Sequence, residues 1–281
     1  MEKSEFKRVI TTRKAVLAFC LGIIILVFSQ VISALPGQLP LPKSVATIVY
    51  GGLYVFISYR LLKVVCTKIV PISLEECRIG KPYISKIWFL VAIFLPAIVS
   101  AVLLCMPGEF VRNDLSHLDI FNIVMSALFV VGFGAGVVEE MIFRGFIMAV
   151  LERRWGKRIA IVIPSVLFGL LHASGGMHLL DVLILLVAGT SVGIMFSLIV
   201  YESGSIWCSA LVHGIWNMIM IGGILNIGMS HNENAIYSYD LFSESILLTG
   251  GEFGVEASIV AIIGYAMVII LALYVMKRKS C

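Results

Sequence analysis

The chain has 281 residues, of which 60% are hydrophobic and only 14% are charged. Soluble domains are nearer half apolar and about a quarter charged, so this composition excludes an ordinary soluble protein and predicts one that crosses a membrane several times. The net charge of +4 does not indicate a nucleic-acid partner, because the basic residues cluster in loops beside apolar segments.

Apolar segments of about 20 residues follow one another along the chain, without the alternation typical of barrel strands. A helix satisfies its backbone hydrogen bonds within the segment, as lipid requires. We therefore predict an all-α, polytopic membrane protein that forms a single membrane domain over residues 1–281. The eight expected spans are 15–35, 45–65, 87–106, 121–151, 159–174, 179–200, 206–224 and 257–276.

Lysine and arginine are distributed unevenly between these spans. They crowd the N-terminus, the segments 60–86 and 153–158, and the C-terminus, whereas 159–276 contains none. The positive-inside rule then predicts that both termini are cytoplasmic, and an even number of spans agrees with this orientation. The loop of about 225–256 would lie outside and is acidic.

The six cysteines form no CxxC pair, so we expect no metal or redox centre built on sulfur. Cys66 and Cys77 are assigned to a basic loop. Asp181 and Glu202, near the two ends of the span 179–200, are interpreted as a helix cap and an interfacial charge.

The run "GFGAGVVEEMIFRGF", residues 132–146, places Glu139, Glu140 and Arg144 within the apolar span 121–151. Ionisable residues inside a membrane are costly and are functional candidates for that reason. Glu140 and Arg144 are four residues apart, acid before base, which predicts an ion pair on one helix face. Glu139 lies on a different face, so we expect it to remain outside this ion pair. Three nearby glycines predict that another helix approaches closely, at positions 132, 134 and 136.

Three more polar residues fall in later spans. His172 ends "FGLLH" in the span 159–174, and "HGIWN" carries His213 and Asn217 on one face of the span 206–224. When the spans alternate in direction, these side chains reach a depth similar to that of Glu139, in the cytoplasmic half of the membrane. We therefore expect them to form one site, although each residue taken singly is compatible with ordinary helix packing.

Two chemistries suit this set of side chains. A carboxylate with two imidazoles and a carboxamide can position a water molecule and stabilise an oxyanion, which is what hydrolysis of an amide requires. Alternatively, Glu139, His172 and His213 could bind zinc and leave one position for water. The helical HExxH signature is absent. We prefer the metal-free version for two reasons. The amide of Asn217 is an uncommon zinc ligand, and Glu140, the acid that could support a zinc-binding histidine, is expected to pair with Arg144 instead.

The three motifs resemble those of a known family. "EEMIFR" is similar to EExxxR, "FGLLH" to FxxxH and "HGIWN" to HxxxN of the type II CAAX prenyl endopeptidases and their bacterial relatives, the Abi or CPBP intramembrane proteases. The resemblance covers about residues 121–222, which would form the catalytic core. It implies a helical membrane fold whose site lies inside the bilayer and opens toward the cytoplasm and lipid.

Because every motif position is present, the resemblance also implies a set of catalytic residues. The first acid would activate water, with the second acid and the arginine supporting it. The first histidine would orient that water, and the second histidine and the asparagine would steady the oxyanion. These residues are Glu139, Glu140, Arg144, His172, His213 and Asn217.

The expected function is that of an intramembrane endopeptidase acting on a membrane-associated or lipid-modified peptide, in a bacterial plasma membrane. Relatives are often named metalloproteases, although a metal-free, glutamate-based mechanism is also proposed for them. The alternative is a non-catalytic membrane regulator or a bacteriocin self-immunity protein. An ion-coupled transporter is disfavoured because the chain has no paired halves.

Overall fold

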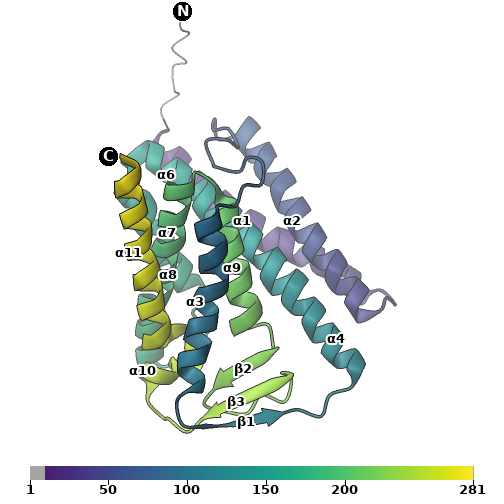
Figure 1. Cartoon of the computed structure of the whole chain (residues 1–281). Coiled ribbons are helices and arrows are strands. Elements are labelled where there is room, and N and C mark those ends of the chain that lie inside the picture. The colour runs from purple at the N-terminus through teal and green to yellow at the C-terminus, as the bar shows by residue number, and fades with distance from the viewer. Residues whose placement is uncertain (1–9, 281) are drawn as a thin grey trace, which may run out of the picture.

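A computed structural model describes residues 10–280 and shows a bundle of helices with a small sheet at one end (Figure 1). Lys3, Lys7 and Arg8, which contributed to the predicted orientation, and Cys281 lie outside the described residues. The α-helices are α1 (Thr12–Ala34), α2 (Lys43–Lys68), α3 (Lys86–Leu104), α4 (His117–Ser126), α5 (Gly136–Glu139), α6 (Met148–Trp155), α7 (Lys157–Leu171), α8 (Leu179–Ser203), α9 (Ile206–Met220), α10 (Ile246–Thr249) and α11 (Ile259–Ser280).

Every predicted span contains helix, but not every helix is long enough to cross a bilayer. Within residues 10–280, six stretches combine sufficient length and hydropathy: Thr12–Gln38, Lys43–Lys68, Lys86–Leu104, His117–Trp155, Leu179–Ser203 and Ile259–Lys279. Helices α7 and α9 have 15 residues each, which is about 22 Å against a hydrocarbon core of about 30 Å. The structure therefore supports a polytopic membrane protein, while eight full crossings remain a prediction.

The long stretch that carries the acids is not a uniform α-helix. It changes to π-helix in η2 (Ala127–Ala135), returns to α-helix in α5, and changes again in η3 (Glu140–Ile147) before α6. A π-helix bonds residue i to i+5, and such turns often occur at functional sites. The change of helix type therefore falls between Glu139 and Glu140.

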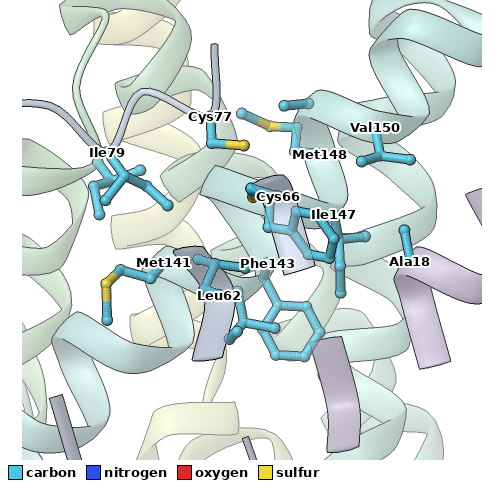
Figure 2. Close-up of a cluster of buried hydrophobic side chains, with 14 of the residues drawn as sticks. Ala18, Leu62, Cys66, Cys77, Ile79, Met141, Phe143, Ile147, Met148 and Val150 are labelled. Carbon is cyan, nitrogen blue, oxygen red and sulfur yellow. The ribbon is translucent and has the colours of Figure 1, made fainter. Parts of the chain in front are cut away.

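The second π-helical segment is buried on all sides. Met141, Phe143 and Ile147 of η3 and Met148 of α6 lie in the larger hydrophobic core, against side chains from α1, α2 and the segment after α2 (Figure 2). These neighbours include Ala18, Leu62, Cys66, Cys77 and Ile79. Cys77 lies in the loop after α2, as assigned, whereas the assignment of Cys66 to that loop is wrong because it belongs to α2. Both thiols are buried in this core. The dense packing holds the acid-bearing helix in place.

A three-stranded sheet departs from the all-α prediction. Its strands are β1 (Gly108–Arg112), β2 (Leu225–Gly228) and β3 (Tyr237–Leu241), in the order β1-β3-β2. β1 runs antiparallel to β3, whereas β2 runs parallel to it. All three strands lie in predicted outer loops, at the end of the bundle opposite the C-terminal end of α11 (Figure 1).

Glu202, which we predicted to be an interfacial charge, connects helices at the end of the bundle. It is buried at the end of α8, where Trp88 Nε1 of α3 donates to its Oε2 at 2.5 Å. Lys279 of α11 approaches its Oε1 with Nζ at 2.6 Å. One carboxylate therefore joins three helices at the end of the bundle away from the sheet.

Candidate functional site

Glycines allow the helix that carries Glu139 and Glu140 to pack closely against α9. A β-carbon added to Gly136 would lie 2.9 Å from the Cα of Gly214, and one added to Gly214 would lie 2.8 Å from the carbonyl oxygen of Gly132. Real side chains do not tolerate such distances, so these backbones can meet only where both residues are glycine. The predicted close approach is confirmed, and it brings α9 within side-chain reach of the acids.

Glu140 and Arg144 form the predicted pair. Both side chains are 0% exposed, and Arg144 Nη1 lies 3.2 Å from Glu140 Oε1. The guanidinium also lies over aromatic rings, 4.3 Å from the centroid of Phe168 and 5.3 Å from that of Phe196. Ring faces attract cations, so the aromatic lining offsets part of the cost of burying this charge.

His213 shares the carboxylate of Glu140 with Arg144. Its Nδ1 lies 3.2 Å from Glu140 Oε1, its Nε2 lies 3.8 Å from Glu139 Oε2, and its ring stacks on Phe196 at 4.7 Å. A carboxylate offers several lone pairs and can serve two donors. The expectation that Arg144 would keep Glu140 away from the histidines is therefore wrong. The ring therefore lies between the two acids: Nδ1 donates to Glu140, and Nε2 faces Glu139.

Glu139 is the less constrained of the two acids. Its side chain is 19% exposed, and within residues 10–280 its Oε2 receives no hydrogen bond. It lines the cavity described below, whereas Glu140 and Arg144 lie behind the cavity wall. The predicted difference between a free and a paired acid is thus present in the geometry.

His172 and Asn217 are each fixed by a backbone carbonyl. His172, which caps the end of α7, places Nδ1 2.7 Å from Phe168 O, and the two rings lie 4.6 Å apart. A carbonyl only accepts, so Nδ1 carries the proton and Nε2 of the neutral ring is an acceptor. Asn217 donates through Nδ2 to Val131 O of η2 at 3.0 Å. One N–H of that amide remains for another acceptor.

These side chains meet at one cavity of about 360 Å³. Glu139, His172, His213 and Asn217 all line it, so four of the six predicted residues converge on a shared space. Part of the wall comes from η4 (Gly251–Phe253) and η5 (Val255–Ala257). These turns follow α10, which lies toward the sheet end of the bundle (Figure 1). The expected site in the cytoplasmic half did not include this segment.

Glu256 is a cavity residue that the sequence reasoning missed. Trp216 Nε1 donates to its Oε1 at 2.6 Å, and Tyr265 Oη donates to its backbone oxygen at 3.0 Å. Burial raises the pKa of Glu256, although the hydrogen bond from Trp216 acts in the opposite direction. The sequence contained one indication of this contact. Glu256 directly precedes the last apolar span, and Trp216, a possible hydrogen-bond donor, directly precedes Asn217.

Asp181 holds the wall segment and does not cap its own helix. His178 occupies the N-cap of α8, while the buried Asp181 accepts a hydrogen bond from the backbone N–H of Glu252 through Oδ1 at 3.2 Å. Next along the chain, Phe253 lies 6.2 Å from His172, ring to ring. The segment is therefore attached to α8 and packed beside the site.

The candidate zinc ligands do not assemble into a metal-binding group. Within the described part of the chain, no three His, Cys, Asp or Glu side chains are placed so that they could hold an ion together. Glu139 and His213 are near each other, but His172 does not complete a set of three with them.

Comparison with known proteins identifies the segment that carries the motifs. Residues 121–219 match the family described as type II CAAX prenyl endopeptidase Rce1-like. The comparisons with curated proteins and with solved structures give no match. The three motifs lie within the matched residues, and each of them contributes a side chain to the cavity, so the geometry agrees with the similarity of residues 121–219 to this family.

Proposed function

We propose that this protein is an intramembrane endopeptidase that hydrolyses a peptide bond in a membrane-associated or lipid-modified peptide. The observation that carries the proposal is a carboxylate, Glu139, that shares a cavity with two histidines and an asparagine and has an oxygen without a hydrogen bond in the described chain. The family match at residues 121–219 supports the reaction class. The surrounding apolar helices suit a substrate held at a bilayer.

The reaction begins with a water molecule held by Glu139. The acid is not neutralised by Arg144, which pairs with Glu140, so its carboxylate can take a proton as the water oxygen attacks the peptide carbonyl carbon. His172 can orient the same water, because Phe168 holds the proton on Nδ1 and leaves Nε2 to accept.

The developing oxyanion requires donors on the opposite side of the carbonyl. The second N–H of the Asn217 amide is available, since only one is used on Val131 O. His213 can donate from Nε2 when both ring nitrogens are protonated, with Nδ1 directed at Glu140 and Nε2 near Glu139. When the C–N bond breaks, the proton held by Glu139 passes to the leaving amine.

Glu140 and Arg144 act through their neighbours. The acid fixes His213 through Nδ1, and the arginine compensates the charge of the acid inside a region closed to solvent. This division of roles predicts different consequences for the two adjacent glutamates when they are replaced.

We further propose that residues 1–281 form one membrane domain in a plasma membrane, with both termini in the cytoplasm. Two basic regions, the turn between α6 and α7 and the end of α11, lie at the same end of the bundle, away from the sheet (Figure 1). Positive residues on one side favour that side as cytoplasmic.

The test is cleavage of an internally quenched, prenylated peptide by purified protein in detergent. Glu139→Gln is nearly isosteric and should abolish cleavage, whereas Glu109→Gln, an exposed acid of β1, should not change it. Wild-type-like cleavage by Glu139→Gln would refute the proposed mechanism. If this variant cleaves nothing yet retains full biological activity in cells, the non-catalytic regulator becomes the better description.

A further inference from the structure

A groove separate from the catalytic cavity lies on the other face of α9. It consists of two adjoining cavities of about 630 and 250 Å³, which share Phe133 and Trp207 in their walls. The larger cavity lies between α2, the segment 74–81 and the helix of the acids, and the smaller one continues along η2 and α9. Within the described chain, neither has a lining residue in common with the catalytic cavity. His213 and Asn217 line the catalytic cavity, whereas Gly214 lines the groove, so α9 separates the two spaces.

The groove is about as deep as one leaflet of a bilayer. Its lining on α9 runs from Trp207 to Met218, a rise of about 16 Å in a helix. The hydrocarbon core of a bilayer is about 30 Å thick, so this length covers roughly half of it. The walls are mostly apolar, and Phe56 and Phe133 are largely exposed within them. Such a depth suits an acyl chain from one leaflet, whereas a partner helix that spans the membrane would need the full thickness.

Basic side chains lie at the mouth of the groove. Lys81 is part of the lining, and the guanidinium of Arg60 lies 5.9 Å from the ring centroid of Phe56, another lining residue. Lys63 follows Tyr59 of the lining by four residues and therefore continues the same face of α2. Within residues 10–280, none of these three cations forms an ion pair.

Other basic residues of the same region are already neutralised. Arg78 pairs with Glu152 at 2.8 Å. Arg153 pairs with Glu76 at 2.5 Å. Glu75 is the one acid of the groove lining in the described chain. The mouth therefore carries an excess of positive charge that the protein itself does not balance.

The mouth lies where lipid head groups are expected. The end of α2 and the start of α3 are at the end of the bundle away from the sheet, which is the end that we propose to be cytoplasmic (Figure 1). Tryptophan and tyrosine prefer the level of the head groups, and Trp207 and Tyr59 both belong to the lining near the mouth. The indole Nε1 of Trp207 donates to Gly80 O at 2.9 Å, which fixes the ring there.

We propose that this groove binds an anionic glycerophospholipid of the cytoplasmic leaflet. One acyl chain would lie along α9 and η2, and the phosphate would lie between Arg60 and Lys81. Basic pockets between membrane helices on the cytoplasmic side recognise anionic head groups in this way. The site is independent of the proposed protease activity, and only the choice of leaflet rests on the proposed orientation.

The experiment measures lipid binding to the delipidated full-length protein in detergent by native mass spectrometry. Phosphatidylglycerol, which is anionic, is compared with phosphatidylcholine that has the same acyl chains and no net charge. The wild-type protein should bind phosphatidylglycerol about 25-fold more tightly, because each of two cations near a head group contributes about fivefold. Lys81→Gln should lower the affinity for phosphatidylglycerol about fivefold and leave that for phosphatidylcholine unchanged. Glu75→Gln should raise the affinity for phosphatidylglycerol.

Two further variants separate the groove from general effects of charge and folding. Lys43→Gln removes an exposed lysine from the opposite end of α2 and should change neither affinity. Gly52→Phe places a ring in the groove and should lower the affinity for both lipids. A β-carbon at position 52 meets no atom within 4 Å, so this variant should keep the wild-type melting temperature.

Phosphatidylglycerol with brominated chains locates the bound lipid, because bromine quenches the fluorescence of a tryptophan that it contacts. Part of the quenching should disappear in Trp207→Phe. Equal affinities for the two lipids, an unchanged affinity in Lys81→Gln, or quenching that Trp207→Phe does not reduce would each overturn the inference. Displacement of the lipid by a prenylated peptide would also overturn it, since the groove would then serve the substrate.

Discussion

Replacing Arg144 by alanine should destabilise the protein strongly as well as inactivate it. The substitution leaves the carboxylate of Glu140 in surroundings where its side chain is 0% exposed. Breaking a buried ion pair by removing one partner costs about 3–5 kcal/mol. The loss of the guanidinium from the faces of Phe168 and Phe196 adds roughly 0.5–2 kcal/mol.

One contact reduces this cost. His213 keeps its Nδ1 3.2 Å from the same oxygen of Glu140, so the acid does not lose all of its partners. We therefore expect a net loss of about 3 kcal/mol, at the lower end of the range for buried pairs. At about 2–4 °C per kcal/mol for a chain of this size, the melting temperature should fall by roughly 6–12 °C.

The assay is thermal unfolding of purified protein in detergent, measured beside peptide cleavage. Glu139→Gln is the matched control, because within residues 10–280 no hydrogen bond reaches Oε2 of Glu139, and its melting temperature should stay close to that of the wild type. Combining Arg144→Ala with Glu140→Gln should restore part of the lost stability, since the stranded charge is then absent. Equal destabilisation by Arg144→Ala and Glu139→Gln would refute the division of roles between the two acids.

Two further predictions concern topology and metal dependence. In a cysteine-free background, a single cysteine at Asn232 should react with an impermeant thiol reagent from outside intact cells and one at Lys157 should not; equal labelling would contradict the orientation with both ends inside. Cleavage should survive treatment with a strong chelator, and loss of activity that stoichiometric zinc restores would instead favour a metal site at Glu139, His172 and His213.

The parts of this protein that the sequence determined are those that depend on spacing along a single helix. Glu140 and Arg144 are four positions apart in the sequence. This spacing places them on one face in an ion pair even though the segment is π-helical. The small residues at 132 and 136 likewise indicated a close helix approach, because a missing side chain permits contact whatever the partner is. Costly polar residues in apolar spans marked most of the site for the same local reason.

Tertiary structure decided everything that depends on which segments meet. No periodic pattern linked Glu256 to Trp216, because a hydrogen bond between a loop and a distant helix leaves no repeat in the chain. The sharing of Glu140 between Arg144 and His213, the short sheet at one end, and the limited length of α7 and α9 were equally invisible to periodicity. Local spacing sets the direction of a side chain, whereas its neighbours are set by packing between elements far apart in sequence.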